Sequence, residues 1–163
     1  MDSTVFLALG ERLTRALITR DFGLYKTVMD LPLELEPRGV APYTLTTTEA
    51  LREDFNLYCD HVELHGITDI YRDVKEVETV SDEITVIICE LQILSGGCRV
   101  VPPFTCIMTM RLCADNKVRL SRIQSSLGHL NWTIGKGGIT QGKFRNRLDQ
   151  TDTKEPPNGD SND

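Results

Sequence analysis

The chain has 163 residues, of which 40% are hydrophobic and 26% are charged, as in an ordinary globular protein. This length suits one domain with its own core. The formal net charge of −6 argues against a nucleic-acid-binding protein, because phosphate binding needs a concentrated cationic surface. No stretch approaches the roughly 18 apolar residues of a membrane span, and the first residues lack the basic and apolar regions of a signal peptide.

The cysteines favour a reducing compartment. The chain has five of them, an odd number, and none forms a Cys-x-x-Cys motif. Several lie in apolar strand patterns, where a thiol behaves as a small buried hydrophobe. We therefore expect reduced thiols and a cytoplasmic protein. Cys106 has no basic neighbour in the sequence that would lower its pKa, so we predict core packing for it rather than a nucleophilic role.

The first half of the chain predicts three helices and two small strands. Apolar residues at helical spacing favour an amphipathic helix over residues 4–18. Asp21 is a suitable cap for a short helix over residues 22–29. The alternating, proline-bounded segment 31–37 is typical of a short edge strand, and a second small strand follows at residues 43–46. A third helix begins at Thr47 or Thr48 and ends at Gly66.

The second half predicts four long antiparallel strands joined by tight hairpins. They cover residues 70–80, 84–94, 99–112 and 118–127, and the third is interrupted at Pro102-Pro103. Helices followed by a run of strands indicate an α+β fold in which three helices cover one face of the sheet.

The last part of the chain has a different composition. The apolar periodicity stops after Gly135, and residues 149–163 carry five acidic residues and almost nothing apolar. Such a segment cannot offset its ordering entropy by burial. We therefore predict a domain over residues 1–135 and a flexible, acidic tail over residues 136–163.

Three local motifs, in this order among the predicted elements, carry a family resemblance. They are the run 16–21 at the exit of the first helix, Thr48-Glu49-Ala50-Leu51, and the acidic turn and strand of residues 115–120. Over residues 4–128 the chain resembles the nuclear-transport-factor-2-like superfamily, which includes ketosteroid isomerase, scytalone dehydratase, limonene epoxide hydrolase and the SnoaL-type cyclases, and in residues 125–133 its uncharacterised bacterial members. The resemblance implies a cone-shaped, curved antiparallel sheet around a pocket and a homodimer formed through the outer sheet face. It implies no single activity, because the superfamily contains enzymes, binding modules and adaptors.

Glu36 is a candidate catalytic base through this resemblance, because a carboxylate base precedes a proline at a similar place in the isomerase branch. Proton abstraction would need a raised pKa at Glu36 and hydrogen-bond donors for the oxyanion. The positions that correspond to those donors are Leu13 and Met108, and neither side chain can donate. This argues against a ketosteroid-isomerase mechanism, and the alternative for Glu36 is a solvated residue beside a turn.

Glu90 interrupts an apolar strand, where a charge is costly unless it is paired or faces a wet cavity. Two interpretations stay open. Glu90 is either a pocket carboxylate or part of an ion pair on the outer face with Arg99, Arg111 or Arg122.

We predict no metal and no cofactor. His61 and His65 lie four residues apart on the third helix, but the order His-Val-Glu-Leu-His differs from the His-Glu-x-x-His zinc motif. We expect this pair on a partly exposed flank of the helix. No phosphate loop or dinucleotide fingerprint is present.

The sequence favours a protein that binds a small, mostly apolar molecule inside the cone. Besides Glu36 and Glu90, the candidate pocket residues are aromatic, apolar and amide side chains: Tyr58, Phe104, Met108 and Gln124. One alternative is a proton-transfer enzyme, a cyclase, dehydratase or isomerase, with Glu36 or Glu90 as base. Another is a non-catalytic dimeric interaction module whose cone is filled by side chains. Whether the protein is catalytic is left open.

Overall fold

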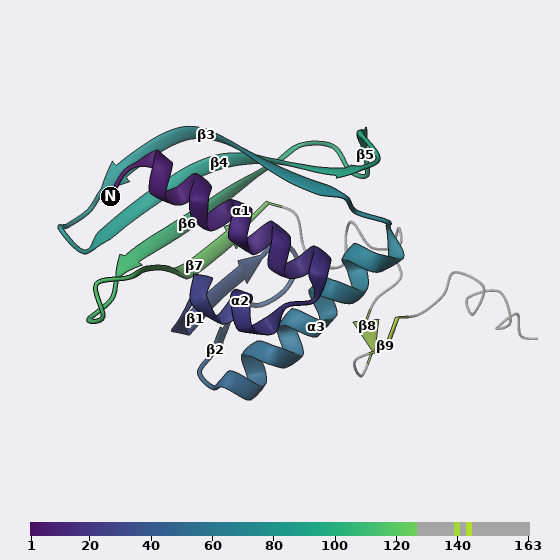
Figure 1. Cartoon of the computed structure of the whole chain (residues 1–163), viewed down its shortest axis with the longest axis horizontal. Helices are drawn as coiled ribbons and strands as arrows, with labels where there is room; N and C mark the ends of the chain where they lie inside the picture. The colour runs from purple at the N-terminus through teal and green to yellow at the C-terminus, as the bar shows by residue number, and fades with distance from the viewer. Residues whose placement is uncertain (127–138, 141–142, 145–163) are drawn as a thin grey trace, which may run out of the picture.

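The computed structural model describes residues 1–126, 139–140 and 143–144. Three helices pack on one face of a curved sheet (Figure 1). The helices are α1 (Ser3–Thr19), α2 (Phe22–Val28) and α3 (Thr48–Leu64). The strands are β1 (Met29–Pro37), β2 (Tyr43–Leu45), β3 (Asp69–Thr79), β4 (Ile84–Ser95), β5 (Cys98–Arg99), β6 (Phe104–Leu112), β7 (Val118–Ser125), β8 (Ile139–Thr140) and β9 (Lys143–Phe144). The α+β fold class is confirmed.

Each helix begins at a short polar residue that accepts the first free amide hydrogens. The Asp2 carboxylate caps α1, the Asp21 carboxylate accepts from Leu24 N at 2.9 Å, and the Thr47 hydroxyl accepts from Ala50 N at 3.1 Å. Gly66 follows α3 with a φ of +57°, a left-handed conformation that favours glycine. The sequence identified Asp21 and Gly66 correctly, and Thr47 is the cap of the third helix.

The main sheet has the order β2-β1-β7-β6-β4-β3, with β5 paired to β4 (Figure 1). The pairs β3–β4, β4–β6 and β6–β7 are antiparallel, as expected. The prolines do divide the third long strand, because Pro102 and Pro103 separate β5 from β6.

The prediction of an edge strand at residues 31–37 is wrong. β1 lies between β2 and β7, and it runs parallel to β7. Its prolines do not interrupt the ladder, because Pro32 falls at the register irregularity between Met29 and Glu34 and Pro37 is the last residue of the strand.

Alternation along the strands separates an inner face from an outer face. On β4, every second side chain from Thr85 to Ile93 is buried against the helices, and the residues between them are half-buried. On α1, the face that carries Phe6, Leu9 and Leu13 is buried. The core therefore lies between the helices and the inner face of the sheet.

The predicted domain boundary at residue 135 lies outside the described residues. Of the predicted tail, the structure describes only the short antiparallel pair β8–β9. Across residues 1–126, 139–140 and 143–144, no helix is both long enough and apolar enough to span a membrane.

Candidate functional site

A cavity of about 110 Å³ lies between the helices and the inner face of the sheet. All three helices and the strands β1, β3, β4, β6 and β7 contribute to it. Most of its lining is apolar: Leu13, Leu17, Met29, Leu35, Pro37, Ile70, Leu91, Ile93, Phe104, Met108 and Ile123. The other lining residues are Tyr25, Glu36, Tyr58, Arg72, Cys106 and Ser125.

Arg72 on β3 places a cation in this cavity, because an arginine keeps its charge in proteins. Its Nη1 donates to Gly10 O at 3.0 Å, to Thr14 Oγ1 at 2.8 Å and to Ile70 O at 3.2 Å. Its Nε is buried and has no hydrogen-bond partner among the described residues. Burial lowers the pKa of Arg72, which means that the protein interior disfavours the charge.

Gly10 on α1 makes room for this side chain. A Cβ atom at Gly10 would lie 2.9 Å from Arg72 Cδ and 3.3 Å from both Nε and Nη1. A side chain at residue 10 would therefore require the helix or the arginine to shift.

The sequence contains a signal for Arg72 that the predicted set of site residues leaves out. Ile70, Arg72 and Val74 alternate, so they share one face of β3, and Arg72 lies opposite the buried Leu91 on β4. A positive charge between two apolar residues on the core-facing side of a strand is unusual. Nothing in the sequence shows that Gly10, 62 residues earlier, receives this side chain.

Cys89 and Cys106 lie opposite each other on β4 and β6, close to Arg72. Both are free and buried, and the Cys89 thiol donates to Cys106 O at 3.5 Å. The hydrogen bond with Cys89, followed by burial, raises the pKa of the Cys106 thiol. A protonated, buried thiol agrees with the core role expected for Cys106.

The structure does not support Glu36 as a base. Its carboxylate accepts hydrogen bonds from Gln124 Nε2 and Arg122 Nη2, and these two contacts lower the pKa of Glu36. Glu36 lies at the margin of the cavity. Its neighbours Leu35 and Pro37 are buried, and successive side chains of a strand point to opposite faces. The Glu36 carboxylate is therefore directed towards Arg122 and Gln124 on the outer face.

Gln124 lies opposite Glu36 in the parallel pair and does not line the cavity. The cavity residues of β7 at this level are its neighbours Ile123 and Ser125. The structure therefore places Gln124 outside the cavity lining, because a shift of one residue along a strand changes the face.

Glu90 lies on the outer face, since its neighbours Cys89 and Leu91 point inward. It is opposite Asp73 on β3 and Thr105 on β6 and does not line the cavity. Its predicted arginine partners are engaged elsewhere among the described residues: Arg99 donates to Gln92, Arg111 to Asp30, and Arg122 to Glu36. Glu90 therefore lies on the outer face, as the second interpretation has it, but among the described residues it forms no ion pair with these three arginines.

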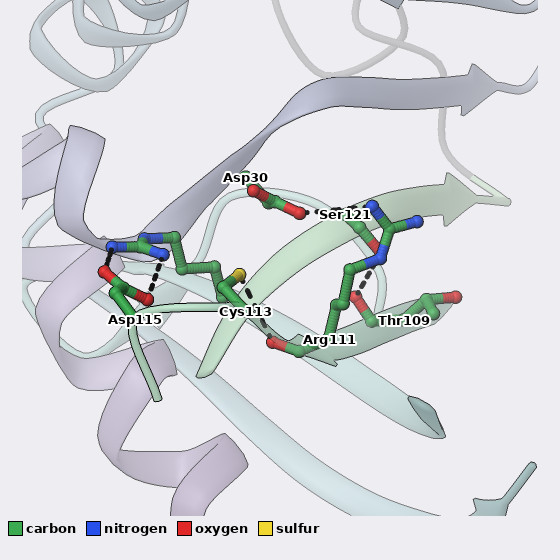
Figure 2. Close-up of polar contacts among 7 residues, drawn as sticks. Asp30, Thr109, Arg111, Cys113, Asp115 and Ser121 are labelled. Atoms are coloured by element: carbon green, nitrogen blue, oxygen red, sulfur yellow. Dashed lines mark hydrogen bonds and ion pairs between the residues drawn. The ribbon is translucent and has the colours of Figure 1, made fainter. Parts of the chain in front are cut away.

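Figure 2 shows the contact of Arg111 with Asp30. Arg111 pairs with Asp30 at 3.3 Å and so connects β6 to β1 at one end of the sheet. Nearby, the Arg119 guanidinium holds the Asp115 carboxylate in the turn before β7, and this contact lowers the pKa of Asp115 to about 2. These contacts connect strands and turns, and neither arginine lines the cavity.

The other predicted pocket residues do line the cavity. Tyr58 comes from α3, and Phe104 and Met108 come from β6. Leu13, the position at which the isomerase branch has an oxyanion donor, also lines the cavity and presents only apolar atoms there. Ligand contact by these residues stays a prediction.

The histidine pair is placed differently from the sequence-based expectation. His61 is only 2% exposed, so it is buried rather than part of an exposed flank, and His65 is half-buried. A helical wheel describes one helix and does not show how far neighbouring segments cover its flank. The described residues contain no group of three side chains able to hold a metal ion.

A buried acid that was not among the predicted site residues lies beside the cavity tyrosines. Asp54 on α3 is 9% exposed, and its Oδ1 accepts a hydrogen bond from the Tyr43 hydroxyl at 2.9 Å. Burial raises the pKa of Asp54 to about 6, although the hydrogen bond acts in the opposite direction. Burial, followed by the charge of Asp54, raises the pKa of Tyr25 and of Tyr58, so both phenols are neutral.

Several solved structures have a fold similar to that of this chain. A nuclear-transport-factor-2-like protein of unknown function from Shewanella oneidensis superposes with a TM-score of 0.58 over 77% of this chain and 98% of its own, at 12% identity. A nuclear-transport-factor-2-like protein from Cytophaga hutchinsonii superposes with a TM-score of 0.57 over 78% of this chain and 98% of its own, at 14% identity. A third nuclear-transport-factor-2-like protein, from Novosphingobium aromaticivorans, superposes with a TM-score of 0.54 over 77% of this chain and 81% of its own, also at 14% identity.

The chain has the nuclear-transport-factor-2-like fold. The resemblance carried by the element order and the three motifs is thus confirmed at the level of the fold. No protein-family model matches the chain, and no curated protein matches its sequence. Identities of 12–14% transfer the architecture of the cone and no activity.

Proposed function

We propose that this nuclear-transport-factor-2-like protein binds a small, mostly apolar molecule inside its cone. The observation that carries the proposal is the cavity itself, which is lined mostly by apolar side chains from all three helices and five strands. Such concave, apolar spaces with a few polar groups are the usual form of a ligand site.

The size of the cavity limits the ligand. Typical sites for drug-sized ligands occupy roughly 300–1,000 Å³, whereas an apolar cavity of about 150 Å³ accommodates benzene. A cavity of about 110 Å³ is smaller than that, so the part of a ligand enclosed in it is limited to at most one small ring or a short branched chain.

Binding is favoured over the proton-transfer alternative by the positions of the two candidate carboxylates. Glu90 lies outside the cavity, and the Glu36 carboxylate is engaged by Arg122 and Gln124. The pKa of Glu36 is lowered by its two partners rather than raised as a base would require, and Glu90 does not line the cavity.

Native mass spectrometry of gently purified protein, followed by denaturation, is the first test, because a released small mass would identify a retained ligand. The second test is a titration of isotope-labelled protein with toluene, followed by NMR. We expect shifts of the cavity residues in the native protein and a much weaker response in Ile123→Trp, whose larger side chain fills the cavity.

Tyr71→Trp is the matched control. Tyr71 precedes Arg72 on β3 but is 56% exposed, so a tryptophan there leaves the cavity unchanged. Absence of any toluene response in the native protein, or equal responses in the native protein and Ile123→Trp, would contradict binding in the cone.

A further inference from the structure

Arg72 is a half-buried cation without a counter-ion among the described residues, and its Nε is fully buried. The groups that accept its hydrogen bonds are neutral: Gly10 O, Thr14 Oγ1 and Ile70 O. The ionisable groups whose electrostatics act on it are the thiols of Cys89 and Cys106. A charge removed from water is unfavourable unless it is paired, so a ligand that supplied the opposite charge would gain from this arrangement.

The pattern of its hydrogen bonds leaves one edge of the guanidinium unused. All three acceptors bind Nη1, while Nε and Nη2 have no acceptor among the described residues. Nε and Nη2 form the side-on fork of an arginine, whose two parallel N–H groups match the two oxygens of a carboxylate.

The apolar lining of the rest of the cavity indicates that the other end of the ligand is apolar. The lining around Arg72 is apolar on β3, β4 and β6, with Ile70, Leu91 and Met108 as examples. A ligand that fits both features has one anionic head and a compact apolar body.

We propose that the cavity binds a small organic carboxylate, with its head on Arg72 and its apolar body against the surrounding side chains. This proposal rests on the proposed function and specifies the chemical class of the ligand. Benzoate is a suitable probe for the whole ligand, and toluene is a probe of nearly the same shape without the charge.

The test is an NMR titration of isotope-labelled native protein, Arg72→Met and Arg15→Met with benzoate and with toluene at neutral pH. Methionine retains the apolar stem of Arg72 without its charge. Arg15 is exposed on α1, so its substitution is a control for the change in net charge. We expect Arg72→Met to weaken benzoate binding by about tenfold or more, as for loss of hydrogen bonds to a charged group, and to retain toluene binding.

The outcomes separate the two proposals. If toluene binds the native protein and benzoate binds native and Arg72→Met equally, or does not bind, the carboxylate proposal is overturned and apolar binding stands. If neither probe binds the native protein, both proposals fail. If Arg72→Met does not fold, Arg72→Lys replaces it: weaker benzoate binding with unchanged toluene binding supports recognition by the fork, and equal benzoate binding overturns it.

Discussion

Two polar residues outside the sequence-based predictions, the half-buried Arg72 and the buried Asp54, define the electrostatics around the cavity. Arg72 retains its charge and makes three hydrogen bonds through one nitrogen. Asp54 is held by one phenol, and its Oδ2 has no hydrogen-bond partner among the described residues. Both residues carry a cost of burial, and each gives a measurable effect on stability.

Because Gly10 contacts Arg72, we expect Gly10→Ala to lower the stability of the protein, although alanine has the higher helix propensity. Alanine in place of glycine in a helix interior usually stabilises by about 1 kcal/mol. At residue 10 we expect net destabilisation instead, because the new Cβ would lie 2.9 Å from Arg72 Cδ, in the middle of a constrained side chain. Urea unfolding of Gly10→Ala measures the change.

A double-mutant cycle identifies the cause. In an Arg72→Ala background the clash is absent, so Gly10→Ala should there become stabilising. The same destabilisation in both backgrounds would show that the Arg72 contact is not responsible.

Asp54 predicts a pH dependence of stability. Its folded pKa of about 6 lies above the usual value near 3.8, so the fold favours the protonated acid. The associated stabilisation is present below about pH 4 and is lost as the pH rises through about 6. The shift corresponds to about 3 kcal/mol at most.

Asp54→Asn isolates this effect from the other titrating groups. Asparagine is neutral and retains an oxygen that accepts from Tyr43. We expect the free energy of unfolding of Asp54→Asn, relative to that of the native protein, to rise between pH 4.5 and pH 7.5. A difference that is constant over this range would contradict the raised pKa.

At the scale of elements, the parallel pairing of β1 with β7 decides which polar groups meet. It aligns Glu36 with Gln124 and Glu34 with Arg122, so four polar side chains lie together on the outer face. The strand order therefore engages the Glu36 carboxylate at the margin of the cavity and places Gln124 outside the cavity lining.

Glu36→Gln tests this arrangement. Because the carboxylate is engaged outside the cavity, we expect toluene binding to remain unchanged and thermal stability to fall slightly, since the contact is partly exposed and screened by solvent. The midpoint of thermal unfolding and the NMR titration give the two readouts. Loss of toluene binding in a folded Glu36→Gln protein would place the carboxylate at the ligand.

At the scale of the whole molecule, the outer face of the sheet carries apolar side chains that the helices do not cover. Ile88 and Ile107 lie opposite each other on β4 and β6 and are half-buried in the single chain. We propose that two chains associate through this face, as the family resemblance implies. Sedimentation velocity at tens of micromolar should show a dimer in the native protein.

Ile88→Lys should shift this equilibrium towards the monomer, because it places a charge beside Ile107 in the proposed interface. Ile18→Lys on α1 is a suitable control, since Ile18 is 38% exposed on a helix and lies away from the outer face of the sheet. A native protein that sediments as a monomer would remove the dimer from consideration.

Local signals in the sequence predict the three helices and the main strands in the correct order. Periodicity, caps such as Asp21, and the glycine and proline positions are local signals, because each depends on residues within one or two turns of the chain. They were sufficient to predict the α+β class, the antiparallel hairpins and, with the family resemblance, the cone.

Which side chains meet depends on contacts between segments that are distant in the sequence. The insertion of β1 between β2 and β7, the outward direction of Glu36 and Glu90, and the contact of Arg72 with Gly10 depend on strand order and register. A shift of one residue moves a side chain to the opposite face of a sheet. The candidate site differs from the sequence-based prediction for this reason: periodicity predicts that a strand forms, while packing between distant segments decides what faces the cavity.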